Sequence, residues 1–107
     1  MTDDGRWVEA CSEGDLALNN PLRVEIDGLA LAIVKTDEGI FAVSDTCSHA
    51  QWSLSEGEVE DCMIECGLHG ARFDLRTGVQ SGPPATSPIP TYLTTTADGT
   101  VRVQIHA

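Results

Sequence analysis

Two short segments of the chain each bring a cysteine close to a histidine. In CSHAQW one residue separates Cys47 from His49, and in CGLHG two residues separate Cys66 from His69. Thiolate and imidazole groups are protein ligands that suit zinc and iron. The whole chain has only four cysteines and three histidines, so the pattern C-x-H, sixteen residues, C-x-x-H concentrates these ligands in two places. The pattern predicts one metal centre with ligands from two loops.

The spacing within the pairs favours a centre with two metal atoms over a single zinc ion. A structural zinc site gathers four ligands around one tetrahedral ion, usually from pairs separated by about two to four residues. A cysteine and a histidine with one residue between them are awkward ligands for that geometry. In a two-iron centre, Cys47 can bind one iron while His49 reaches the other, and Cys66 and His69 can do the same. A zinc site and four residues that share no metal remain alternatives.

Two thiolates on one iron and two imidazoles on the other are the ligands of a Rieske [2Fe–2S] cluster. The sequence resembles the Rieske ferredoxins, small electron carriers of bacterial ring-hydroxylating dioxygenase systems, in Cys47, His49, Cys66, His69, Gly70 and the GPP segment at 82–84. The resemblance covers essentially the whole chain. It implies one [2Fe–2S] cluster held by the two cysteines and two histidines. It also implies an all-β Rieske fold of antiparallel sheets, with the cluster at the tip of an insertion.

The sequence departs from other Rieske proteins at four positions. Those of cytochrome complexes carry a further cysteine in each loop, joined as a disulfide, where this chain has Trp52 and Leu68. We therefore expect packing and the cluster itself to hold the loops. Those relatives also carry hydroxyl donors to sulfur where this chain has Ala71 and Phe73. Because such donors stabilise the reduced state, we expect a midpoint potential near the bottom of the Rieske range of about −150 to +300 mV.

The segments on both sides of the predicted loops have the alternating pattern of strands. Apolar and polar residues alternate at 22–26 and 29–33, and the intervening Asp27-Gly28 predicts a tight hairpin turn. The remaining predicted elements are a short turn or helix within 12–18, a turn at 36–39, a strand after it, and two strands flanking ADG at 97–99. No convincing helical stripe is longer than two turns. The pattern predicts an all-β scaffold.

The 107 residues are enough for one compact domain. Between about residues 44 and 90 the alternation weakens, and cysteine, histidine, glycine and proline accumulate. We therefore expect a single domain over 1–107, with a scaffold formed by about 1–43 and 91–107 and a cluster-binding subdomain at about 44–90.

The net charge of −11 constrains the partners. It disfavours nucleic acids and membrane surfaces, and it favours transient docking on a basic protein surface. The start of the chain lacks a basic segment followed by an apolar run, so we expect no signal peptide. The sequence thus predicts a cytoplasmic protein, in which cysteines stay reduced.

The remaining chemically notable residues have simpler interpretations. We expect Cys11 to be a small core residue, Cys62 an exposed thiol open to oxidation, and His106 a surface residue. Arg72 and Arg76 are expected to form a salt bridge within the cluster-binding subdomain. The aromatic residues predicted to pack in the scaffold core are Trp7, Phe41 and Tyr92.

The resemblance implies an electron carrier, not an enzyme. A catalytic Rieske oxygenase needs a mononuclear iron bound by two histidines and a carboxylate, and only His106 is left once the cluster takes two histidines. We expect a monomer that takes one electron at a time from a flavoprotein reductase using NAD(P)H and delivers it to a terminal non-haem iron oxygenase. Docking is expected at the end carrying His49 and His69. The alternative is another electron-transfer role, such as one linked to iron–sulfur cluster assembly.

Overall fold

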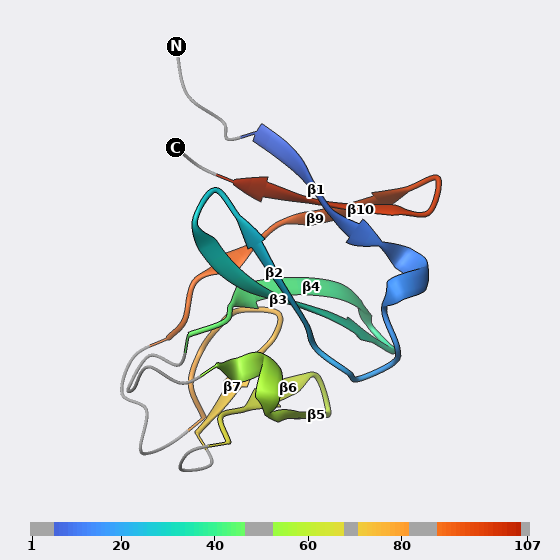
Figure 1. Ribbon diagram of the computed structural model, residues 1–107. Coiled ribbons are helices and arrows are strands. Elements are labelled where there is room, and N and C mark those ends of the chain that lie inside the picture. Colours follow the sequence, from blue (N-terminus) through green and yellow to red (C-terminus); the bar gives the residue numbers. More distant parts are fainter. Residues whose placement is uncertain (1–5, 47–52, 68–70, 82–87, 106–107) are drawn as a thin grey trace.

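The computed structural model describes residues 6–46, 53–67, 71–81 and 88–105, which form three antiparallel sheets (Figure 1). The first sheet has the order β1-β10-β9 and the second β2-β3-β4-β8, while β5-β6-β7 form the third. The elements are β1 (Arg6–Ser12), η1 (Glu13–Asp15), β2 (Leu22–Ile26), β3 (Leu29–Thr36), β4 (Gly39–Ser44), η2 (Leu54–Glu56), β5 (Glu58–Glu60), β6 (Met63–Glu65), β7 (Arg72–Asp74), β8 (Thr91–Tyr92), β9 (Thr94–Ala97) and β10 (Thr100–Ile105). The predicted all-β class is confirmed.

Two-residue turns join the hairpins where Asp-Gly pairs occur. Asp27 and Gly28 have φ angles of 53° and 83°, and Asp98 and Gly99 have φ angles of 54° and 77°. Positive φ at both central positions matches the right-handed twist of the flanking strands, and aspartate and glycine tolerate it better than most residues. The turn predicted at Asp27-Gly28 is therefore confirmed, and the short helix expected within 12–18 is the 3₁₀ turn η1.

The central strand β3 is covered on both of its faces. Leu31 and Ile33 belong to a core shared with the β1-β10-β9 sheet, whereas Ala32 and Val34 belong to a second core shared with the third sheet. Because successive residues of a strand point to opposite faces, four consecutive buried residues require cover on both sides. This double cover explains the continuous apolar run in β3.

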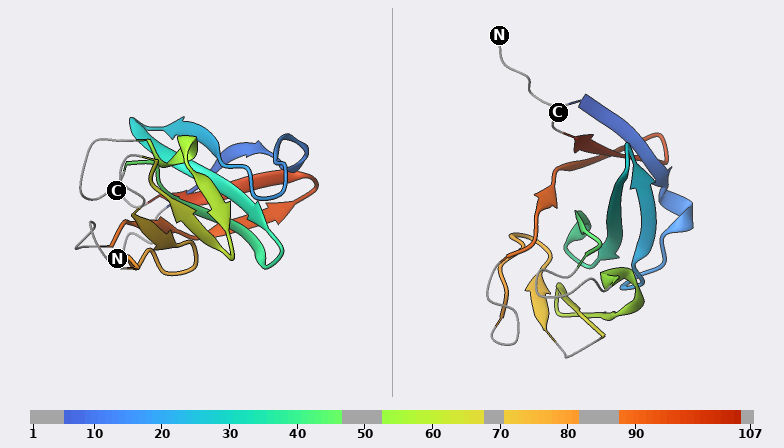
Figure 2. Two further views of the ribbon diagram at one scale, coloured as in Figure 1. Left: turned by 90° about the horizontal axis from the view of Figure 1, so that it is seen from below. Right: turned by 60° about the vertical axis from the view of Figure 1, so that its left-hand side comes forward.

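The third sheet lies at one end of the molecule, and the β1-β10-β9 sheet lies at the other (Figures 1 and 2). The core between the third sheet and β3 is formed by side chains with little or no accessible surface, among them Leu54, Ile64, Phe73 and Leu75. Each such side chain stabilises the fold by about 1.5–3 kcal/mol relative to an exposed position. The third sheet is therefore anchored to the second by a contiguous apolar contact.

Two expectations about burial were wrong. Trp7 is 45% exposed, because β1 is an edge strand whose inward face is formed by Val8 and Ala10. Cys62 is only 4% exposed, because it occupies the turn between β5 and β6, which folds its side chain into the second core beside Thr36.

The other predicted core residues lie at the edges of the cores. Cys11 and Tyr92 are half-buried against the core between the first two sheets, and Phe41 packs against the second core. His106 lies outside the described residues. Within the described ranges, no helix has the length and apolar character that crossing a bilayer requires.

Candidate metal centre

Of the four predicted ligands, Cys66 is the one that the structure describes. It directly follows β6, has no accessible surface, and its thiol is free of any disulfide. Cys47, His49 and His69 lie outside the described residues, as do Gly70 and the GPP segment. The site is therefore described through the residues on either side of each predicted loop, which we call the stems of the loop.

The stem of the second loop is an extension of the ladder between β6 and β7. Glu65 pairs with Arg72, and beyond them the N–H of Cys66 donates to the carbonyl oxygen of Ala71 at 2.6 Å. Ala71 is fully buried and belongs to the same core as Cys66. The backbone of Cys66 is thus held by a sheet hydrogen bond and by packing of its side chain in the second core.

The stem of the first loop is held more locally. Thr46 and Ser53 form an isolated antiparallel bridge on either side of 47–52. One residue further out, the N–H of Leu54 donates to the carbonyl oxygen of Asp45 at 2.6 Å. Leu54 anchors this stem because its side chain is fully buried in the second core.

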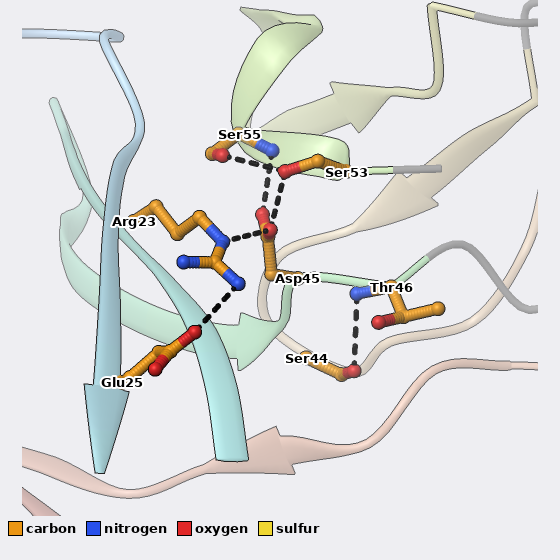
Figure 3. A network of polar contacts seen from close by, with 7 residues as sticks. All are labelled: Arg23, Glu25, Ser44, Asp45, Thr46, Ser53 and Ser55. Atoms are coloured by element: carbon orange, nitrogen blue, oxygen red, sulfur yellow. Dashed lines mark hydrogen bonds and ion pairs between the residues drawn. The ribbon is translucent and has the colours of Figure 1, made fainter. Parts of the chain in front are cut away.

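A buried carboxylate ties the same stem to the scaffold (Figure 3). Asp45 accepts hydrogen bonds from the hydroxyl of Ser53, from the N–H of Ser55 at 2.7 Å and from Nε of Arg23 at 3.1 Å. Arg23 lies on β2 and also pairs with Glu25 at 2.9 Å. This network was missed by the sequence analysis. The one local signal for it is an aspartate two residues before a predicted ligand.

The residues on either side of the third segment of the predicted site, 82–87, are hydrogen-bonded to the same region. Before it, the N–H of Ser81 donates to the carbonyl oxygen of Arg72 at 2.8 Å. After it, the N–H of Ile89 donates to Gly78 at 2.9 Å, and Pro90 accepts from Ser44 at 2.9 Å. The stems of all three segments thus join the third sheet and the adjacent end of β4.

Two arginines form ion pairs with acidic residues in and around the third sheet. Arg76 donates to Asp74 at 3.1 Å and reaches Glu38, in the turn between β3 and β4, at 2.9 Å. The hydrogen bond from Arg76 is the main reason that the pKa of Asp74 lies below its usual range, and Asp74 in turn raises the pKa of Arg76. Arg72 approaches Glu60 at 4.0 Å. The salt bridge expected within this region is confirmed, and the contact to Glu38 links it to the scaffold.

The two cysteines outside the predicted pairs have raised pKa values. Burial is the main cause that raises the pKa of both Cys11 and Cys62, and the charge of Asp15 raises that of Cys11 further. A raised pKa disfavours the thiolate that a metal binds. Among the described residues, no group of three or more histidines, cysteines or acidic residues is arranged to hold a separate metal ion.

The described residues fit an iron–sulfur cluster. A thiol without a disulfide partner, buried at the end of a strand and directly before a loop, can bind iron while its surroundings exclude water. The side chains of Ala71 and Phe73, buried beside it, contribute no competing metal ligand and no hydrogen-bond donor.

Comparisons with known proteins agree with this fit. Residues 6–93 match the Rieske [2Fe-2S] domain. Over 86 residues the chain is 43% identical to the ferredoxin component of biphenyl 2,3-dioxygenase from Rhodococcus jostii, covering 80% of each chain. The Sphingomonas yanoikuyae B1 ferredoxin superposes with a TM-score of 0.88 at 30% identity, covering 94% of this chain and 99% of that one.

A third relative comes from an assembly. A chain in the complex of reduced oxygenase and oxidized ferredoxin of carbazole 1,9a-dioxygenase superposes with a TM-score of 0.85 at 32% identity, and 92% of each chain is covered. The predicted cofactor, a Rieske-type [2Fe–2S] cluster, and the predicted absence of catalytic activity agree with these relatives. The chain therefore belongs to the Rieske [2Fe–2S] domain family, as one of its small ferredoxins, which carry electrons and are not themselves catalysts.

Proposed function

We propose that this ferredoxin passes single electrons from a flavoprotein reductase that uses NAD(P)H to a terminal non-haem iron oxygenase. The observation that carries the proposal is the 43% identity to a dioxygenase ferredoxin component over 80% of both chains. The complex of a related ferredoxin with its oxygenase supports an oxygenase as the acceptor. A reductase is the matching donor, because a carrier that delivers electrons must be reloaded.

The cluster is proposed to be held by Cys47, His49, Cys66 and His69. The buried, free thiol of Cys66 and the three loop stems on the third sheet support this ligand set. When bound, the cluster accepts and releases one electron. The chain's own contribution is to hold the ligands and to keep water away from the cysteine sulfur.

The end of the molecule that carries the third sheet is proposed to be the docking surface. Electron transfer requires a short path between donor and acceptor, and the predicted ligand loops all have their stems on this sheet and the end of β4. Four exposed acidic residues lie in η2, in β5 and in the turn after β5: Glu56, Glu58, Glu60 and Asp61. Their charge favours a basic partner surface and a transient encounter.

A low midpoint potential is part of the proposal. Ala71 and Phe73 are fully buried directly after the second loop, and neither side chain can donate a hydrogen bond. Without hydroxyl donors, the added electron is less stabilised. A cytoplasmic location, a monomeric state and the division into scaffold and cluster-binding subdomain are also proposed, from charge, cysteine use and sequence pattern.

The decisive experiment combines metal analysis with a reconstituted electron-transfer assay. Anaerobically purified protein should contain iron and acid-labile sulfide in equal amounts, about two of each per chain, with a rhombic EPR signal on reduction. It should also couple the NADH-dependent reductase and the oxygenase of a ring-hydroxylating system. Cys66→Ser should lose the cluster, whereas Cys62→Ser should keep it.

Two results would contradict this proposal. If the protein were colourless and contained zinc, the site would be a structural zinc site and not an iron–sulfur cluster. A normal cluster that no dioxygenase reductase can reduce, but that exchanges electrons with the cluster-assembly machinery, would move the protein to the alternative electron-transfer role.

A further inference from the structure

Asp45 is an acidic residue in a place where an unpaired charge would be costly. It is 2% exposed, and transfer of a carboxylate out of water is unfavourable unless hydrogen bonds replace its hydration. Three groups provide that replacement: the hydroxyl of Ser53, the N–H of Ser55 and Nε of Arg23. The carboxylate therefore depends on its partners, and they are held in position by it.

The partners come from parts of the chain that need to be joined. Asp45 stands just before the first predicted ligand loop, and Ser53 and Ser55 stand just after it (Figure 3). Arg23 comes from β2, and the N–H of Asp45 donates to Ala30 on β3 at 2.9 Å. One side chain thus joins both stems of the loop to the second sheet.

The first loop depends on this junction more than the second loop does. The second is closed by the continuing β6–β7 ladder, whereas the first has an isolated bridge between Thr46 and Ser53 and one further backbone hydrogen bond, from Leu54 to Asp45. A second cysteine that could form a disulfide does not occur between these two residues. Hydrogen bonds to a carboxylate are stronger than those between neutral groups, so the Asp45 side chain is suited to hold the two stems together.

We infer that Asp45 is a positioning residue for the iron–sulfur centre. By fixing the two stems against the second sheet, it sets where the loop presents Cys47 and His49. The inference rests on the proposed assignment of those two residues as ligands. It goes beyond that assignment because it names the scaffold group that keeps the loop, and hence the iron, in place.

Asp45→Asn is the primary test, because it keeps the size of the side chain and removes one acceptor site. An amide has a single oxygen, so it cannot accept from Ser55 on one side and from Ser53 and Arg23 on the other. We expect the reduced cluster to give a broadened EPR signal. Iron should also pass to a chelator about 10- to 100-fold faster than from the wild type, the range typical of lost supporting interactions around a metal site.

Three controls separate positioning from general destabilisation. Glu25→Gln removes the charge of the exposed partner of Arg23 and leaves Asp45 untouched, so iron release should not change. Val103→Ala weakens the core between the first two sheets and should not broaden the EPR signal. Ser53→Ala removes a donor to Asp45, and Ser53→Thr restores a hydroxyl. Fast release in Ser53→Ala and slow release in Ser53→Thr would support the inference even if Asp45→Asn does not fold.

The outcomes distinguish this inference from the proposed function. A wild type without iron and sulfide would overturn the proposed function, and the inference with it. A wild type with a cluster that Asp45→Asn or Ser53→Ala retains equally well would overturn the inference alone. So would release that is no faster than from Val103→Ala when the variants are compared at equal distances below their thermal midpoints.

Discussion

Ala71 and Phe73 are the residues proposed to lower the midpoint potential of the cluster. Both are fully buried, and Ala71 accepts the backbone hydrogen bond that closes the second loop. Their side chains are apolar, carry no hydrogen-bond donor and belong to the same core as Cys66. A single added hydroxyl is therefore a sensitive probe of this environment.

Ala71→Ser is expected to raise the midpoint potential, because a hydroxyl near the ligand sulfur can stabilise the reduced state. Protein-film voltammetry at constant pH measures the change directly. Ala42→Ser provides a matched control, since Ala42 is also a buried alanine but belongs to the core between the first two sheets. Equal potentials for Ala71→Ser and the wild type, or an equal rise in Ala42→Ser, would contradict the proposed role of the missing donor.

Cys62 is expected to react slowly with thiol reagents, contrary to the sequence-based prediction. Burial raises its pKa, so at pH 8 it holds less thiolate than a free cysteine, whose pKa is about 8.5. Labelling should be slower than for a model thiol and should accelerate as the pH rises. Mass spectrometry of the loaded protein after alkylation locates the modified residue. Rapid, pH-independent labelling of Cys62 would show that its turn opens easily.

At the scale of elements, Gly78 in the turn after β7 lies close to the segment that leads into β8. Gly78 has a φ of 80°, and a side chain there would collide with the carbonyl oxygen of Ile89 and approach Thr91. Gly99 has nearly the same backbone conformation, with a φ of 77°, but open space around it. A comparison of alanine substitutions at the two glycines therefore separates the cost of backbone strain from the cost of a steric clash.

Gly99→Ala should cost about 1–2 kcal/mol, the penalty of a left-handed conformation for a residue with a side chain. Gly78→Ala should cost about 1–3 kcal/mol more, since overpacking against backbone is added to that penalty. Thermal midpoints of the loaded proteins measure both effects, at about 4–8 °C per kcal/mol for a domain of this size. Equal midpoints for the two variants would mean that the segment at Ile89 moves aside without cost.

Much of the element level could be predicted from the sequence, and the exceptions are instructive. Alternation in β2 and β10 and the Asp-Gly pairs specify strands and turns locally, so they were predicted correctly. The burial of Cys62 depends on packing beside Thr36, far away in the chain, and no local pattern records that.

The candidate site shows the same limit. Cys66 was predicted as a ligand from its spacing, and its burial is compatible with that role. All four ligands, Cys47, His49, Cys66 and His69, stay predictions. The proposed positioning role of Asp45 could not be predicted from the sequence, because its partner Arg23 is 22 positions away. The expectation that packing and the cluster hold the loops did not include the hydrogen bonds of Asp45 on either side of the first loop.

At the scale of the whole molecule, the charge of −11 should govern association with the redox partners. The reduction rate by a reductase with a basic surface should fall at least about tenfold between low and physiological salt, as screening shortens the reach of the charges. Stopped-flow absorbance at several salt concentrations gives the rates. A rate that is constant or rises with salt would exclude electrostatic steering.

A pair of charge variants tests where on the molecule the partner docks. Neutralising Glu56 and Glu58, which are exposed beside the third sheet, should slow reduction more than neutralising Asp15 and Asp98, which are exposed beside the first sheet. Both double variants change the net charge by the same amount. Equal rates would mean that total charge matters and that the proposed docking end does not.

The pairing of Arg6 with Ile105 has a practical consequence for the use of this protein. The first and last strands run side by side in the β1-β10-β9 sheet, away from the third sheet (Figure 1). A fusion to either strand is therefore attached at the end of the molecule opposite the third sheet. The fused part can be a tag, a tethered reductase or an electrode linker. Such a fusion leaves the end with the third sheet free to meet a redox partner or an electrode.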